Sequence, residues 1–352
     1  MKKEVIVTLI LLILVVGCLP PIKAQYQGNV TVNADGSISP STAPIHQAGN
    51  IYTLTGDMIG SISILRSNLT FDGNGHSLVG LGLNHGVEGL SVGHDAYANP
   101  PVVTGASNVT VKNLNVKGSM WGISLMNASN SLVVNNTVSE TGNGYLSMDQ
   151  QTAGIYIERG GSNVIKGNTL SNNYNGMIFV ESTNNIIVGN TIANCYNPFG
   201  FSAVGIAFWE ASNNTIYHNN FLNNTAQAYG GITIAAAGVA PLATNRWDNG
   251  FPSGGNYWSD YQTKYPNASG IENSGVGSTP YSVDSQNKDN YPLMEPFSAH
   301  VSAASNTSPE NPTASTQEDF PTAMQTAVLA ASVVAVTVVI VGLAVYFKKR
   351  RR

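Results

Sequence analysis

The chain of 352 residues has few charged side chains, since Asp, Glu, Lys and Arg make up only 10% of it, against about a quarter in ordinary globular proteins. A net charge of −4 and a pI near 5.8 leave no basic surface, so we expect no nucleic-acid partner. Only two cysteines occur, Cys18 and Cys195. Because Cys18 lies in an N-terminal signal segment, no internal disulfide is expected.

Ahead of a C-terminal apolar segment, the sequence also lacks any sustained helical period. This absence excludes a fold in which strands alternate with helices. The sequence contains no phosphate-binding loop, no dinucleotide fingerprint and no Ser-His-Asp pattern. Its polarity comes from Asn, Ser, Thr and Gly instead, which are residues typical of strands joined by tight turns.

The N-terminal residues 1–24 predict a secretory signal. Lys2 and Lys3 precede the apolar run Val5–Val16, and Ala24 ends a cleavage site before Gln25. A lipobox ending at Cys18 is an alternative, in which a lipid on Cys18 would anchor the mature N-terminus.

The C-terminal residues 321–347 predict a transmembrane helix. Their uncharged run Ala327–Phe347, at about 1.5 Å per residue, can cross a bilayer core of about 30 Å. The basic tail, residues 348–352, is expected to stay in the cytoplasm. Residues 298–320, rich in Ser, Thr and Pro, are typical of a disordered stalk. These segments together predict a single-pass protein of the cell membrane with an extracellular domain.

Internal repetition is the main signal for the fold. A unit of about 22 residues recurs, with insertions, and holds an asparagine-bearing strand followed by a glycine-led strand. Stacking of such units predicts an all-β fold, a right-handed parallel β-helix over residues 61–297 with residues 25–60 as an N-terminal cap. Asn is expected to stack at one corner and Gly to allow tight turns. The repeated residues are Asn113, Asn136, Asn168, Asn190 and Asn219, and Gly122, Gly154, Gly176, Gly205 and Gly231.

The C-terminal block reads NRWDNGFPSGGNYWSDY from Asn245 to Tyr261 and TPYSVDSQNKDNYPLMEPF from Thr279 to Phe297. With the repeats, it resembles the NosD-like β-helix proteins of archaeal cell surfaces, which belong with the carbohydrate-binding and sugar-hydrolysing β-helix modules. The resemblance covers about residues 60–297 and implies that this block closes the helix. Relatives carry an acidic segment that could bind calcium, whereas Glu272 is the only carboxylate in Ser269–Ser278. We therefore expect that no cofactor is required, and calcium is disfavoured.

The family name also implies copper, but copper sites need clustered His, Cys or Met, and the repeats are poor in all three. One metal-like cluster occurs in the first insertion, at about residues 84–103. Solvated loop residues are the alternative interpretation. The candidate ligands are His85, Glu88, His94 and Asp95.

Acidic residues suggest a second kind of site. Glu181 and Glu210 occupy equivalent positions in consecutive coils, where Asn127 and Arg159 stand in earlier ones. Stacked coils place neighbours about 4.8 Å apart, and carboxyl pairs at such distances carry out glycosidase chemistry. With Asp149, these two are the candidate catalytic residues. The alternative is an exposed polar ladder in which Arg159 relieves the repulsion.

Two insertions, at about residues 140–153 and 193–203, leave the helix at the same corner. They bring aromatic residues near the strands that hold Trp121 and Trp209. Because aromatic faces stack on sugar rings, this corner is a candidate glycan-binding groove. Packing beneath a loop is the alternative. The candidate residues are Trp121, Tyr145, Tyr196, Phe199 and Trp209.

The sequence as a whole predicts a membrane-anchored extracellular β-helix protein that is a cell-envelope or glycan-binding adhesion module. Its expected partners are extracellular polysaccharide or envelope components. A polysaccharide lyase, epimerase or hydrolase is the alternative, and NosD-like metal handling is the lesser one. Candidate N-glycosylation sites are Asn29, Asn68, Asn127, Asn223, Asn267 and Asn306.

Overall fold

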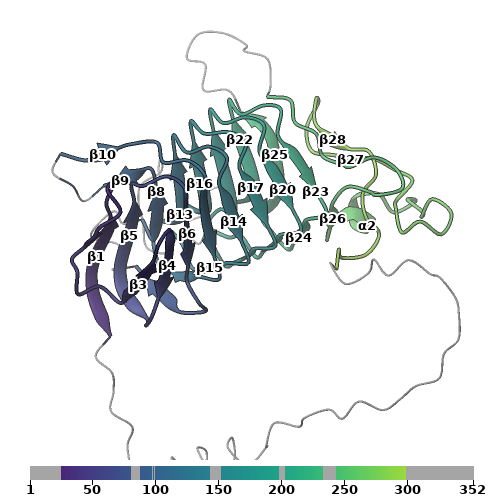
Figure 1. Ribbon diagram of the computed structural model, residues 1–352. Coiled ribbons are helices and arrows are strands. Elements are labelled where there is room, and N and C mark those ends of the chain that lie inside the picture. The colour runs from purple at the N-terminus through teal and green to yellow at the C-terminus, as the bar shows by residue number, and fades with distance from the viewer. Residues whose placement is uncertain are drawn as a thin grey trace, which may run out of the picture. The chain divides into compact units, whose positions relative to one another are not determined.

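The computed structural model describes residues 25–80, 88–96, 98, 100–142, 152–197, 203–232 and 243–298. These residues form a parallel β-helix, whose coils follow one another in Figure 1 from the purple strands to the green ones. The all-β parallel fold predicted from the repeat is confirmed. The signal segment, the transmembrane segment, the basic tail and all of the stalk except residue 298 lie outside the described residues. In the part that is described, no helix has the length and apolar character needed to span a bilayer.

Each complete coil contributes one strand to each of three parallel sheets. Sheets 1 and 2 join at β5, which pairs with β8 through Ile62–Ile64 and with β7 through Met58–Ile59. Sheet 1 consists of β1 (Tyr26–Val32), β5 (Met58–Ile64), β8 (Leu90–Val92), β13 (Trp121–Met126), β16 (Ala153–Glu158), β19 (Met177–Val180), β22 (Val204–Trp209) and β25 (Ala226–Ile232). Sheet 2 consists of β7 (Ser77–Val79), β12 (Asn115–Lys117), β15 (Thr137–Ser139), β18 (Thr169–Ser171), β21 (Thr191–Ala193), β24 (Asn220–Leu222) and β26 (Tyr257–Trp258). Sheet 3 consists of β3 (Ile45–Ala48), β4 (Ile51–Leu54), β6 (Leu69–Asp72), β11 (Val109–Lys112), β14 (Leu132–Val134), β17 (Val164–Lys166), β20 (Ile186–Val188) and β23 (Thr215–Tyr217).

Short antiparallel elements occur at the ends and in one insertion. At the N-terminal end, β2 (Ile38–Ser39) pairs with β1, and β3 pairs with β4. In the first insertion, β9 (His94–Asp95) pairs with β10 (Val102–Val103). Beyond the last coil follow α2 (Tyr261–Lys264) and the pair β27 (Tyr281–Ser282) and β28 (Lys288–Asp289).

The core runs along the inside of the coils. Because side chains alternate across a strand, the inward positions of the long strands stack as continuous aliphatic columns. One such column in sheet 1 is fully buried and consists of Ile123, Ile155, Met177 and Ile206. Each of these side chains stabilises the fold by about 1.5–3 kcal/mol relative to exposure.

Buried asparagines form two ladders that run from coil to coil. In ladder 1, the amide nitrogen of Asn190 donates to Asn219 Oδ1 at 2.9 Å, and its backbone N–H donates to the same oxygen. Each rung therefore satisfies polar groups that would otherwise be buried without partners. Ladder 1 consists of Asn136, Asn168, Asn190, Asn219 and Asn256. Ladder 2 consists of Asn163, Asn185, Asn214, Asn245 and Asn287.

The residue before seven of the ten rungs has a left-handed backbone, which explains the frequent Asn-Asn pairs. Asn135 has φ 54° and precedes Asn136, and Asn213 has φ 60° and precedes Asn214. Asparagine tolerates this conformation better than other residues that carry a side chain. Two different roles at each corner therefore fall on adjacent residues, one exposed in the turn and one buried in the ladder.

Two predictions about the repeat residues were wrong. Asn113 is in register with the turn residue Asn135, so the rung position in its coil is held by Leu114. The strand glycines do not turn the chain. Gly122, Gly154, Gly176 and Gly205 precede or lie within strands at ordinary φ, and a Cβ at each would overlap a carbonyl oxygen of the next coil.

Gly231 does not continue that series. The residue of β25 that continues the column of strand glycines after Gly205 is Gln227, and the register between β22 and β25 then shifts at an irregularity. The glycines therefore mark close approach between coils, an interaction that sequence alone does not reveal.

The C-terminal block closes the core, as the resemblance implied. Trp247 and Trp258 are both 1% exposed. Trp258 stacks on Phe221 of the last coil at 4.5 Å and on Tyr281 at 4.2 Å. Its indole N–H donates to Asp289 Oδ2, which also accepts the backbone N–H of Asn256 and so ends ladder 1.

Candidate functional site

Three segments outside the described residues connect sheet 2 to sheet 1, and the sequence predicted a common corner for the second and third of them. Each follows a strand of sheet 2 and precedes a strand of sheet 1: residues 81–87 before β8, 143–151 before β16 and 198–202 before β22. Four of the candidate site residues, His85, Tyr145, Asp149 and Phe199, fall in these segments and so lie outside the described residues.

The outer face of sheet 1 carries an apolar cluster separate from the core. Trp121 and Tyr156, on adjacent coils, stack with ring centroids 4.3 Å apart and planes 8° apart. Trp209 lies on β22, two coils beyond Tyr156, and packs against the same cluster. We call these three residues the aromatic platform. Its surroundings are Ala153, Ile178, Val180 and Met126.

The structure thus brings Trp121 and Trp209 to one surface, whereas Tyr196 follows β21 and is 63% exposed. Sequence reasoning missed Tyr156. Its signal was present, because Tyr156 alternates with Ile155 and Ile157, which both point into the core.

A chain of polar contacts borders the platform. The Tyr156 hydroxyl donates to Glu158 Oε2 at 3.1 Å, and Arg159 Nη1 lies 3.2 Å from Glu158 Oε1. Arg159 Nε donates to Glu181 Oε2 at 2.9 Å on the next coil. The Arg159 side chain is therefore held between two carboxylates.

The candidate acid–base pair has the expected alignment. Backbone pairing places Asn127, Arg159, Glu181 and Glu210 at the same position of successive coils, and Glu210 is exposed. However, the hydrogen bond from Arg159 lowers the pKa of Glu181 below its ordinary value. A general acid needs the opposite shift, so the geometry matches the polar-ladder alternative more closely.

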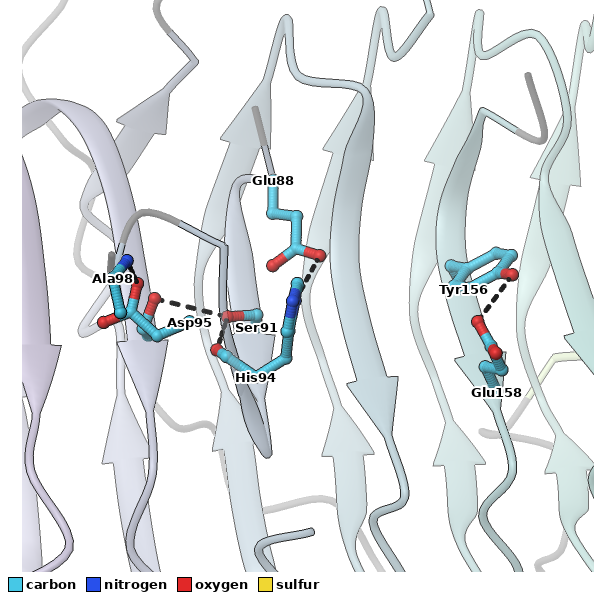
Figure 2. Close-up of polar contacts among 8 residues, drawn as sticks. Glu88, Ser91, His94, Asp95, Ala98, Tyr156 and Glu158 are labelled. Carbon is cyan, nitrogen blue, oxygen red and sulfur yellow. Dashed lines mark hydrogen bonds and ion pairs between the residues drawn. The ribbon is translucent and has the colours of Figure 1, made fainter. Parts of the chain in front are cut away.

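A second charged pair lies on the same face, towards the N-terminal end (Figure 2). Glu88 is 2% exposed, and its Oε1 lies 3.0 Å from His94 Nδ1. This hydrogen bond is the main reason why the pKa of His94 is raised, and the charges of Asp95 and Glu158 act in the same direction. Glu88 is in register with Trp121 on the next coil, because the N–H of Gly89 donates to the Trp121 carbonyl.

The metal-like cluster is only partly assembled among the described residues. Asp95 is engaged elsewhere, since its Oδ2 accepts from Thr31 Oγ1 at 3.1 Å and its Oδ1 from the N–H of Ala98. Within the described ranges, no group of three or more His, Cys, Asp or Glu could hold a metal ion. Cys195 is fully buried, and burial raises the pKa of its thiol. The donors that the structure describes therefore do not fit a copper ion, which prefers imidazole, thiolate and thioether ligands.

Several buried polar atoms on this face have no hydrogen-bond partner in the described structure. They include the Ser124 hydroxyl, which lies beside Tyr156 in the strand register, Glu88 Oε2 and Trp209 Nε1. Such atoms normally bond to protein, water or ligand. These buried atoms lie beside the platform, and their hydrogen-bonding capacity is unused in the described structure.

The candidate glycosylation sites are on the surface. The five that the structure describes are all exposed, and Asn306 lies outside the described residues. The exposed sites are Asn29, Asn68, Asn127, Asn223 and Asn267.

Comparison with known proteins identifies the family. The family model described as periplasmic copper-binding protein (NosD) matches residues 64–263. The chain belongs to the NosD family. No curated protein matches it.

Among solved structures, this NosD-family chain is similar to β-helix proteins at low identity. The periplasmic alginate epimerase AlgG is 16% identical, with a TM-score of 0.37 over 53% of this chain and 40% of that one. The enzymatically active domain of tailspike protein 2 from bacteriophage CBA120 is 16% identical, with a TM-score of 0.28 over 47% and 36%. A tailspike protein mutant of E. coli bacteriophage HK620 is 11% identical, with a TM-score of 0.22 over 56% and 55%. The chain thus covers less than two thirds of the length of each.

Proposed function

We propose that the protein is a glycan-binding module and that the outer face of sheet 1 is its binding surface. The observation that carries this proposal is the aromatic platform beside buried polar atoms without partners. Aromatic rings offer a flat apolar face to a sugar ring, and adjacent polar groups can bond to its hydroxyls. Parallel coils repeat every 4.8 Å or so, which suits an extended chain of sugar units.

Catalysis is the weaker candidate for this surface. The lowered pKa of Glu181 disfavours a general acid at that position, and burial raises the pKa of Tyr156, which disfavours its use as a base. The Glu88–His94 pair supports the enzyme alternative, because histidine is the commonest general base. The same binding assay tests it, since an enzyme would release shorter products.

We place this module outside the cell, anchored by one C-terminal span with a cytoplasmic basic tail. The support is the sequence of residues 1–24 and 321–352. We also take the β-helix to be right-handed, because connections between parallel strands of one sheet have that hand in about 98% of cases. Protease treatment of intact cells tests the location: removal of the β-helix supports it, and protection contradicts it.

The experiment for glycan binding uses the full-length protein in a mild detergent on a glycan array, followed by calorimetry with the best ligand. We expect Trp121→Ala and Trp209→Ala to weaken binding about tenfold each, which corresponds to about 1.4 kcal/mol. Phe251→Ala is the matched control, since Phe251 is 49% exposed in the C-terminal block. Equal affinity of all three variants would move binding away from sheet 1, and an array without any bound glycan would contradict the proposal.

A further inference from the structure

We infer that the glycan bound by the outer face of sheet 1 is cationic, a polymer of amino sugars with free amines, and that this face rejects polyuronates. The inference rests on the proposed glycan-binding function and adds the chemical class of the ligand. It comes from the distribution of charge around the aromatic platform.

Lysine and arginine are missing from the strands of sheet 1. None of its eight strands contains either residue. The segments that lead into the sheet or follow its last strand, residues 81–87, 143–151, 198–202 and 233–242, contain none in their sequence either. Lys112 and Lys166 lie on sheet 3 and Lys117 lies on sheet 2, whereas Arg159 directly follows β16 of sheet 1.

Carboxylates, by contrast, border the platform at several coils. Glu88 and Asp95 lie at its N-terminal end, Glu158 lies beside Tyr156, and Glu181 and Glu210 continue the row. They outnumber the two cationic groups of this face that the structure describes, His94 and Arg159.

Both cationic groups are already engaged by carboxylates. His94 Nδ1 lies 3.0 Å from Glu88 Oε1, and Arg159 contacts Glu158 at 3.2 Å and Glu181 at 2.9 Å. An acidic glycan would therefore have to break an existing ion pair to reach a cation, and its own carboxylates would face the exposed carboxylate of Glu210. A glycan with ammonium groups avoids both difficulties.

Trp121 and Trp209, the partly exposed rings of the platform, suit an ammonium group as well as a sugar ring, whereas Tyr156 is only 4% exposed. Cations are attracted to the faces of Trp and Tyr rings within about 6 Å of the centroid. Glu210 is exposed one coil beyond Glu181 and directly follows Trp209. An amino sugar over Trp209 would therefore have a carboxylate within reach of its amine.

The test compares oligosaccharides of one length and linkage that differ in charge, using the full-length protein in detergent and calorimetry. β-1,4-linked glucosamine hexamer carries amines, N-acetylglucosamine hexamer is neutral, and mannuronate hexamer is anionic. We expect the amine form to bind at least ten times more tightly than the neutral form, and the uronate to show no binding. Raising salt from about 0.05 M to 0.5 M should remove most of the advantage of the amine form, because screening shortens the reach of exposed charges.

Variants locate the charge effect. Glu210→Gln and Glu181→Gln should each reduce the advantage of the amine form severalfold, because they weaken binding of the amine form more than binding of the neutral form. The matched control is Glu272→Gln, since Glu272 is exposed with φ 46°, the same backbone angle as Glu181, but lies in the C-terminal block. Thermal unfolding checks that each variant is folded, and Glu210→Gln leaves the Arg159 contacts intact.

The outcomes separate the two proposals. Binding of the uronate as tightly as the amine, or equal binding of amine and neutral forms in protein and variants alike, would overturn the charge inference while glycan binding stood. Failure of all three oligosaccharides and of the wider glycan array would remove the binding function itself.

Discussion

The corner between sheets 3 and 2 and the corner between sheets 2 and 1 are built from the same plan but differ in regularity. At the first, an unbroken series of asparagines fills the buried position from Asn136 to Asn256. At the second, the equivalent position after the left-handed residue is Thr141, Asn173, Cys195 and Asn224. Residues 143–151 and 198–202 follow the two positions that are not asparagine.

The difference distinguishes the corner that holds the coils together from the corner that leads to the candidate site. A continuous ladder ties each coil to the next, so a chain insertion there would interrupt several bonds at once. The interrupted corner keeps only part of these bonds, between Thr141 and Asn173 and between Cys195 and Asn224, and it leads into the strands of the aromatic platform. Regularity thus marks the structural side of the helix, and its loss marks the side that carries the candidate site.

Removing a rung of ladder 1 should have the largest effect. Asn190→Ala leaves the backbone N–H of Asn168 without its acceptor and the Ile165 carbonyl without its donor, and it removes one of the two bonds of the Asn168 amide, which keeps the Val133 carbonyl. At about 1–3 kcal/mol for each buried group left unpaired, we expect a loss of at least about 3 kcal/mol in the free energy of unfolding, measured by denaturant titration.

The comparison of corners is tested by the same substitution at Asn173. Asn173 makes fewer bonds, to Thr141 and the Val138 carbonyl, so Asn173→Ala should cost less than Asn190→Ala. The control is Asn184→Gly, an exposed turn position with φ 59° that glycine adopts freely. An equal or greater loss at Asn173 would contradict the distinction between the corners.

Asp289, which ends ladder 1, should make the free energy of unfolding depend on pH. Burial raises the pKa of Asp289 from 3.8 to about 7. Between about pH 4 and 7 the carboxyl keeps its proton in the folded state and loses it in the unfolded state. Stability should therefore fall with rising pH in that interval, by up to about 1.36 kcal/mol per pH unit, and level off above it.

Asp289→Asn isolates this contribution. Asparagine keeps an acceptor for the Asn256 N–H and the Trp258 indole but does not titrate. Denaturant titrations from pH 4 to 8 should show a shallower decline in the variant than in the parent protein. Parallel pH profiles would mean that Asp289 has an ordinary pKa.

The Glu88–His94 pair should contribute less than Asp289 to the free energy of unfolding. Its contribution should also depend on pH. The pKa of His94 is raised in the folded state, so the pair stabilises fully below the unfolded pKa of about 6.5 and loses its effect as pH rises through the folded value. His94→Gln should cost about 1 kcal/mol at pH 5.5 and less at pH 9. A cost independent of pH would assign His94 a packing role only.

Much of the fold was predictable because two local rules recur in the sequence. Asn-Asn pairs, such as Asn135 and Asn136, combine a left-handed turn with a buried rung, and alternating apolar residues mark the strands. The prediction for Asn113 was wrong because Leu114 occupies the rung position in that coil. Only the stacking of neighbouring coils shows which of the two residues is buried.

The site was less predictable because its contacts join distant residues. The partner of Asp95 is Thr31, 64 residues away, brought near by the stacking of β1, β5 and β8. Likewise, Arg159 and Glu181 meet only because their coils are adjacent. Sequence spacing predicted that Trp121 and Trp209 approach one surface, but the stack of Trp121 on Tyr156 depends on side-chain orientation.

The smallest effect is expected from placing an asparagine at the interrupted corner between sheets 2 and 1. Cys195 is fully buried, and its backbone N–H donates to Asn224 Oδ1, as the rungs of ladder 1 do. In Cys195→Asn, the new amide should donate to Asn224 and accept from the Asn173 N–H. We expect a gain of about 0.5–1 kcal/mol in the free energy of unfolding, which is the net value of a hydrogen bond, with Cys195→Ala as the control that only removes the thiol.

The sign of this change decides why the ladder is interrupted. A gain would show that the corner still accepts a rung, so the cysteine reflects relaxed constraint beside the insertion. A loss greater than that of Cys195→Ala would show that close packing against Gly176 excludes the larger amide, since Cys195 Sγ would lie 3.3 Å from a Cβ at that position. In that case the irregular corner would be imposed by the approach of the coils, and the insertions would be its consequence rather than its cause.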